Sequence, residues 1–140
     1  MYLRNCDCVT YERTDPFMKT ILLVEDNDDV REAVAELLRD EGYDVREAEH
    51  GGVALEQLAQ METEPCLVLL DLMMPVMSGP ELLRVLSETN RLASLRVVVL
   101  SAGGKAGDAP EAKKFLRKPV EPSVLLAVVR EFCGDCSSQG

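Results

Sequence analysis

The sequence lacks any long apolar run, and this excludes a conventional membrane-spanning helix. No segment approaches the roughly 20 apolar residues that a helix needs to cross a bilayer. The N-terminal segment also lacks the apolar core of a secretory signal, because charged residues recur along it; they are Arg4, Asp7, Glu12, Arg13 and Asp15. We therefore expect a cytoplasmic protein with no membrane partner.

Positive charge is also scarce. The chain has 15 Lys and Arg residues against 25 Asp and Glu residues, which gives a formal net charge of −10. Affinity for a nucleic-acid backbone comes largely from Lys and Arg, so nucleic acid is not an expected partner. At 140 residues the chain fits one domain and has no room for a separate output domain. Its function is therefore expected to depend on contact with other proteins.

The five cysteines form two terminal pairs and one isolated residue. Cys6 and Cys8 form a CxC motif and Cys133 and Cys136 form a CxxC motif, and together these could supply four thiolates to a metal. We favour the interpretation that both pairs lie in polar tails outside the core and stay reduced. Cys66 lies in an apolar strand pattern and is expected to be a core residue.

Strand-like and helix-like segments alternate along the chain, which is typical of a parallel sheet with helices on both faces. The segment 101–114 contains glycines and Pro110 and is too short for a full helix between the last two strands. Five strands are expected at residues 21–24, 43–48, 66–70, 95–100 and 115–116.

Between these strands, apolar residues recur at helical spacing. In the first helix Asp29 and Glu32 are expected as a capping pair, and the inward positions are expected to be Val30, Ala33, Val34, Leu37 and Leu38. The last helix is expected to open at Pro122.

Carboxylates stand where two of the expected strands end. Asp71 follows the apolar run 66–70, and Glu25 with Asp26 follows the run 21–24. A lysine, Lys118, precedes Pro119 near the end of the fifth expected strand. Because the carboxyl ends of parallel strands meet at one edge of a sheet, the three carboxylates and the ammonium are expected to converge there.

Such a cluster suits phosphoryl chemistry. Crowded carboxylates repel one another unless a cation neutralises them, and Mg²⁺ prefers oxygen ligands and accepts phosphate oxygens. Asp26 and Asp71 are expected as direct Mg²⁺ ligands and Glu25 as an acid acting through water. Lys118 could meet a phosphoryl oxygen, and Ser101 could add a hydroxyl donor. Together they suit transfer of a phosphoryl group to Asp71.

The motifs ILLVEDN, LVLLDLMMPVMSG, VVVLSA and FLRKP, in this order from about Lys19 to Cys133, resemble the receiver domains of two-component response regulators. The resemblance implies an α/β fold with a doubly wound, flavodoxin-like parallel sheet of strand order 2-1-3-4-5, here with the fourth helix shortened or missing. Residues 1–17 show no periodicity and are expected to be an N-terminal extension outside the fold. The receiver domain is expected to span residues 18–135 and a polar C-terminal tail residues 136–140.

The resemblance also implies roles for individual residues. Asp71 would be the phosphoacceptor, and the backbone carbonyl of Met73 would join Asp26 and Asp71 around Mg²⁺. Ser101, Phe115 and Lys118 would form the switch, and the Lys118–Pro119 bond would be cis. A histidine kinase or phosphotransfer protein would be the donor, and an unidentified protein would be the target.

Competing functions fit the sequence less well. Aspartyl phosphohydrolases usually carry a second acid two residues after the nucleophile, where this chain has Met73. A multiple-turnover enzyme is therefore not expected. A module that is never phosphorylated would typically have lost part of the acidic set, and a flavodoxin-like cofactor site would need glycines after Val24, where the loop is acidic. Because the fourth helix is short, we expect a monomer or a weak dimer.

Overall fold

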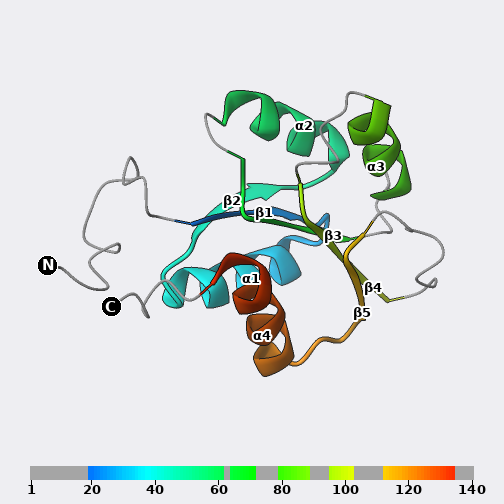
Figure 1. Cartoon of the computed structure of the whole chain (residues 1–140). Helices are drawn as coiled ribbons and strands as arrows, with labels where there is room; N and C mark the ends of the chain where they lie inside the picture. The colour runs from blue at the N-terminus through cyan, green and yellow to red at the C-terminus, as the bar shows by residue number, and fades with distance from the viewer. Residues whose placement is uncertain (1–18, 62–63, 72–78, 89–94, 103–111, 135–140) are drawn as a thin grey trace, which may run out of the picture.

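The computed structural model describes residues 19–61, 64–71, 79–88, 95–102 and 112–134. Within them five parallel strands form one sheet in the order β2-β1-β3-β4-β5. Helices α1 and α4 cover one face of the sheet, and α2 and α3 cover the other (Figure 1). The predicted fold class, a doubly wound parallel sheet of order 2-1-3-4-5, is confirmed. The elements are β1 (Thr20–Val24), α1 (Asp28–Asp40), β2 (Asp44–Ala48), α2 (Gly51–Gln60), β3 (Leu67–Asp71), α3 (Gly79–Glu88), β4 (Val97–Ser101), β5 (Lys114–Arg117) and α4 (Pro122–Cys133).

The central strands are apolar apart from one polar residue at an end of each, because both of their faces are covered. Successive side chains of a strand point to opposite faces, so β1 divides its residues between two cores. Leu22 and Val24 belong to the cluster beneath α2 and α3, and Ile21 and Leu23 belong to the cluster beneath α1 and α4. β3 and β4 divide their residues in the same way, which fixes the register of the three central strands.

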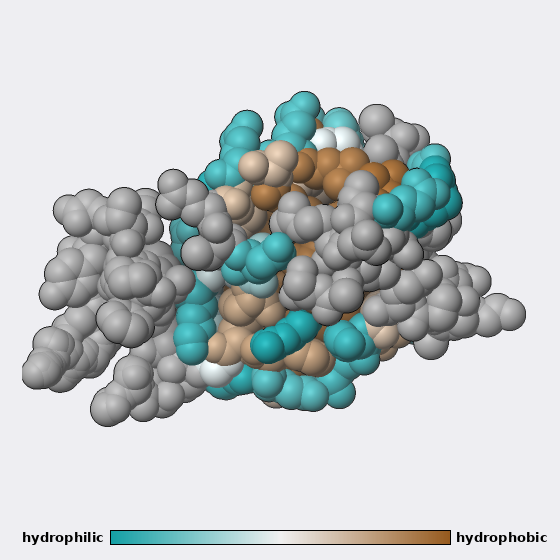
Figure 2. Space-filling model, turned by 45° about the horizontal axis from the view of Figure 1, so that its top comes forward, coloured by the Kyte–Doolittle hydropathy of each residue, from teal (hydrophilic) through white to brown (hydrophobic). Residues whose placement is uncertain are grey.

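On both faces of the sheet, some apolar residues are only partly buried against the core. On the α2 side, Val53, Leu55 and Met61 are only partly buried against the core. Figure 2 accordingly shows apolar residues at the surface among hydrophilic ones on the side that carries α2 and α3. Among the described residues, none of the helices is both long and apolar enough to cross a membrane.

Helix α1 begins differently from the prediction. Its N-cap is Asn27, whose side-chain oxygen accepts a hydrogen bond of 3.0 Å from the backbone N–H of Val30. The predicted capping pair of Asp29 and Glu32 is therefore wrong, because both residues lie inside the helix. The predicted apolar face is confirmed in part: Leu38 is buried and Val34 and Leu37 pack against the core. Val30, which is 38% exposed, and Ala33 lie outside this face, and Ala35 is buried instead.

The connection from β4 to β5 spans residues 102–113, which is too short for a full-length crossover helix, as the sequence predicts. Residues 103–111 of this connection lie outside the described residues. The helix that follows β5 is α4, and Pro122 stands at its beginning, as predicted.

The prediction for the cysteines is wrong for Cys133. This residue is 6% exposed and forms a disulfide with Cys66 instead of lying as a free thiol in a polar tail. The reason is the length of α4: Leu125 and Val129 are buried, and Cys133 follows them at the same four-residue spacing on the same face. Cys66 is partly buried and packs against the same core cluster. The remaining cysteines, at positions 6, 8 and 136, lie outside the described residues.

Candidate functional site

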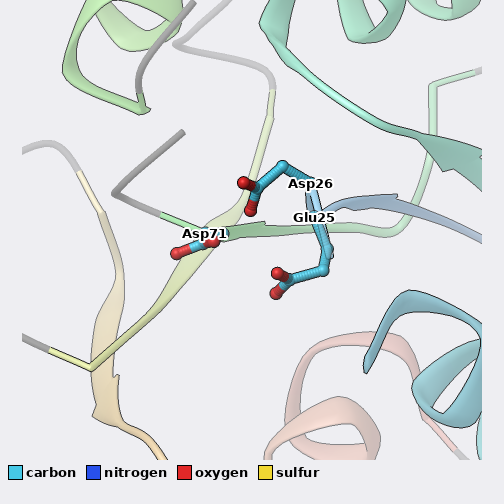
Figure 3. Close-up of side chains that lie close together, drawn as sticks. All are labelled: Glu25, Asp26 and Asp71. Atoms are coloured by element: carbon cyan, nitrogen blue, oxygen red, sulfur yellow. The ribbon is translucent and has the colours of Figure 1, made fainter. Parts of the chain in front are cut away.

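The acidic residues are positioned by the pairing of β1 with β3. The register places Val24 beside Leu70, so the next residues along the two strands, Glu25 and Asp71, are neighbours at the carboxyl edge of the sheet. Asp26 follows Glu25 in the loop that leads to α1. Figure 3 shows the side chains of Glu25, Asp26 and Asp71 gathered around one small region at the ends of these strands.

The three carboxylates are close enough to share a cation. One oxygen from each of Glu25, Asp26 and Asp71 lies within 4.8 Å of the other two. Glu25 and Asp71 are buried, whereas Asp26 is exposed, so solvent reaches the cluster at Asp26. Hard carboxylate oxygens in a partly open site are the ligands that Mg²⁺ prefers, and the residues present therefore fit that ion.

Lys118 supplies the positive charge of the site. Its Nζ lies 2.6 Å from Oε1 of Glu25 and 3.7 Å from Oδ2 of Asp71. The other carboxylate oxygen of Glu25 accepts a hydrogen bond of 3.2 Å from the backbone N–H of Asn27. Glu25 is thus bonded through both oxygens, and the ammonium is held beside Asp71 by Glu25. Among the described residues, three acidic groups and one basic group form the site, which leaves an excess of negative charge.

Arg31 supports the loop that carries the acidic pair, and the sequence reasoning missed it. Its guanidinium donates to the backbone carbonyl of Glu25 at 2.9 Å, to Asp28 at 2.7 Å and to Glu47 of β2 at 3.3 Å. Burial alone would lower the pKa of Arg31, but hydrogen bonds and charge attraction from Asp28 and Glu47 outweigh it and raise the pKa above its ordinary value. The only signal in the sequence was a basic residue among the acids that open α1.

The hydroxyl and the aromatic residue lie on the neighbouring strands. Ser101 is the last residue of β4 and is fully buried, and its carbonyl accepts a hydrogen bond of 2.9 Å from the backbone N–H of Lys118. Phe115 lies on β5 beside Val99 and packs, partly buried, against the core on the α2 side. The Lys118–Pro119 bond is cis, as the resemblance implies. Met73 lies outside the described residues.

Comparison with known proteins identifies the family that this arrangement belongs to. The family model described as the response regulator receiver domain matches residues 21–130, which is most of the chain. The chain belongs to the response regulator receiver domain family.

Individual relatives agree with this assignment. The response regulator Rre1 of Synechocystis sp. is 38% identical over 119 residues, covering 81% of this chain and 51% of its own. Two crystal structures are similar. The receiver domain of the hybrid histidine kinase CckA is 32% identical, with a TM-score of 0.69, and the match covers 81% of this chain and 98% of that one. The response regulator TrrA of Thermotoga maritima, in complex with Mg²⁺ and BeF, is 28% identical, with a TM-score of 0.71, and the match covers 82% of this chain and 99% of that one.

This receiver domain spans about half of the length of Rre1. Its family consists of signalling switches of two-component systems and not of metabolic enzymes, and its members work with histidine kinases. The acidic cluster at the carboxyl edge of the sheet is the place where such a switch can hold a metal ion.

Proposed function

We propose that this receiver domain is a phosphoryl-accepting switch in which Asp71 receives a phosphoryl group from a histidine kinase or a phosphotransfer protein. The observation that carries the proposal is the position of the Asp71 carboxylate, which ends a buried strand between two other acids and the ammonium of Lys118. The altered surface then engages a protein target. The domain assists its own phosphorylation and dephosphorylation and does not turn over a metabolite.

Asp71 is the best nucleophile among the three acids. Glu25 is bonded through both oxygens, to Lys118 and to the N–H of Asn27. Asp26 is exposed and lies at the start of the loop. Asp71 is buried, and its Oδ2 lies 3.7 Å from the Nζ of Lys118. Its carboxylate is therefore positioned for in-line attack on a phosphoryl group. Lys118 can then stabilise the charge that develops on the phosphoryl oxygens.

Mg²⁺ is the proposed cofactor. Asp26, Asp71 and the backbone carbonyl of Met73 would bind it directly, and Glu25 would act through water. The convergence of the three carboxylates supports this assignment, as does the TrrA structure, whose complex contains Mg²⁺. When bound, the ion neutralises carboxylate and phosphoryl charge. The protein itself holds the acids in place through the β1–β3 pairing and the Arg31 contact with the Glu25 carbonyl.

Ser101, Phe115 and Lys118 are the proposed switch residues. The hydrogen bond between the Lys118 N–H and the Ser101 carbonyl joins the ends of β4 and β5. Movement of the Ser101 hydroxyl and the Lys118 ammonium toward the phosphoryl group therefore changes both strand ends together. Phe115, which has no hydroxyl to bond, fills the space that Ser101 leaves. The signal is the difference in free energy between the two arrangements, and a partner must read it.

We place this activity in the cytoplasm, with the domain as a monomer or a weak dimer. The short connection between β4 and β5 removes part of the surface through which this family commonly dimerises. Size-exclusion chromatography should accordingly show little change in elution volume when acetyl phosphate and Mg²⁺ are added. A phosphorylation-dependent dimer would contradict this part of the proposal.

Intact-mass analysis after incubation with acetyl phosphate and Mg²⁺ tests the proposed phosphoacceptor. Wild type should gain the mass of one phosphoryl group, and Asp71→Ala should not. Asp29→Ala removes an exposed acid from the first turn of α1 and is the matched control, which should be labelled like wild type. Labelling of Asp71→Ala to the wild-type extent would refute the assignment.

A further inference from the structure

The end of the sheet opposite the acidic site carries a pair of cysteines that the phosphoryl chemistry does not use. Cys66 directly precedes β3, and Cys133 is the last residue of α4. The two form a disulfide with a Cα–Cα distance of 5.3 Å and a sequence separation of 67. Since Asp71 stands at the other end of β3, about 16 Å away at the usual rise of a strand, the disulfide forms a separate site.

Contacts that do not involve sulfur hold Cys133 opposite Cys66. The hydroxyl of Tyr43 donates to the carbonyl of Gly134, and the guanidinium of Arg96 donates to the carbonyl of Phe132, each at 2.5 Å. These bonds fix the residues on either side of Cys133. The backbone N–H of Cys66 donates to the carbonyl of Thr20 at 2.8 Å, which fixes the other cysteine to β1. None of these contacts depends on the S–S bond, so we expect them to keep the two cysteines close together after reduction.

The two sulfurs differ in how well a reagent can reach them. Cys133 is 6% exposed and belongs to the core, whereas Cys66 is only partly buried. A soluble thiol or disulfide would thus react first at Cys66. In the cytoplasm, where we have placed the protein, thiols are kept reduced unless a disulfide has a transient or sensing role. A preformed pair of this kind fits reversible formation better than permanent cross-linking.

We propose that Cys66 and Cys133 form a reversible redox modification site that responds to low-molecular-weight disulfides. The Cys66 thiolate attacks one sulfur of the oxidant, the oxidant's S–S bond breaks, and one small thiolate leaves. The Cys133 thiolate then attacks the Cys66 sulfur, which forms the protein S–S bond and releases the second small thiolate. Two protein thiols lose two electrons and two protons, and one oxidant disulfide becomes two thiols.

Formation of the disulfide changes how firmly α4 is attached to the sheet. The disulfide encloses the part of the chain that contains Asp71, Ser101, Phe115 and Lys118. Oxidation adds a covalent tie between α4 and the start of β3, next to the hydrogen bonds from Tyr43 and Arg96. The proposal rests on the cytoplasmic location given above but not on phosphorylation, so the two can be tested separately.

The test uses the full chain with Cys6, Cys8 and Cys136 changed to serine, which leaves only Cys66 and Cys133. The folded protein is equilibrated with mixtures of reduced and oxidised glutathione, quenched with acid, alkylated with iodoacetamide under denaturing conditions and weighed intact. We expect two alkyl groups under reducing mixtures and none under oxidising ones, with neither a retained glutathione adduct nor a change in circular dichroism. Two alkylated thiols after the oxidising mixture, or a persistent glutathione adduct, would overturn the proposal.

The pairing itself is tested in the unmodified chain by peptide mapping without reduction. A linked peptide pair that contains Cys66 and Cys133 is expected after oxidation and should vanish with dithiothreitol. A Cys133–Cys136 link in its place would refute the assignment. The Asp71→Ala variant should give the same result as wild type, because it removes the proposed phosphoacceptor and leaves the cysteines untouched.

Discussion

Replacing Asp71 with asparagine should make this receiver domain more stable when no divalent cation is present. The change keeps the size of the side chain and removes one negative charge from a group of three carboxylates whose oxygens lie within 4.8 Å of one another. Glu25 and Asp71 are both buried, so water screens their repulsion poorly. The repulsion among these charges lowers the free energy of unfolding, and a bound cation would relieve it.

The magnitude follows from the distances. At an effective dielectric constant of about 20, two charges 4.8 Å apart repel by roughly 3.5 kcal/mol. Solvent screening reduces the repulsion from the exposed Asp26 to about 1 kcal/mol. Attraction by Lys118 at 3.7 Å offsets about 4.5 kcal/mol. The charge terms nearly cancel, so the dehydration of the ionised Asp71 carboxylate, which costs several kcal/mol, decides the sign. We expect Asp71→Asn to stabilise by about 1 to 3 kcal/mol, which raises Tm by roughly 4 to 12 °C.

Thermal and urea unfolding in EDTA would measure this difference. Mg²⁺ should then raise the Tm of wild type and should raise that of Asp71→Asn much less, because a ligand stabilises a protein only through its affinity for the folded state. The matched control is Asp29→Asn, which removes an exposed acid from the first turn of α1 and should destabilise slightly. An Asp71→Asn variant less stable than wild type in EDTA would show that attraction by Lys118 outweighs both the repulsion and the dehydration of the ionised Asp71 carboxylate.

Three further outcomes are expected. Asn27→Ala should lower the free energy of unfolding in urea by about 1 kcal/mol through loss of the cap, and Asp29→Ala should lower it less. Lys118→Ala should lower the free energy of unfolding in urea by about 1 to 3 kcal/mol, because it leaves Glu25 buried without its cation. In a double-mutant cycle, adding Glu25→Gln should recover most of this loss. Reduction of the disulfide, whose cysteines lie 67 positions apart, should lower stability by about 4 kcal/mol, and dithiothreitol should not affect the stability of Cys66→Ser.

The parallel sheet and the meeting of the acids could be predicted because both depend on pattern, whereas the strand order was implied by the resemblance to receiver domains. Apolar runs separated by amphipathic segments specify a parallel sheet, and the carboxyl ends of its strands must lie together. Glu25 and Asp71 are adjacent for this reason, through the β1–β3 register. The pairing of Lys118 with Glu25, closer than with Asp71, could not be predicted, because it depends on side-chain rotamers.

Features that depend on tertiary packing escaped the sequence reasoning. The segment NDDV offers several residues that could cap α1, and only the structure shows that Asn27 does so. Arg31 had no motif to mark it, since its role comes from reaching a backbone carbonyl and a neighbouring strand. Cys133 was assigned to a tail because the CxxC motif stands near the chain end, although its spacing from Leu125 and Val129 already placed it on the buried face of a helix.

The attachment of α4 is uneven along its length. Its far end is fastened to the rest of the domain through Tyr43 and Arg96, whereas its beginning at Pro122 follows closely after Lys118. We therefore expect movement of the chain around Lys118 to reach α4 at its first turn more than at its last. The helix would rotate about its C-terminal end, so the greatest movement would occur at its N-terminal end, which is nearest the acidic site.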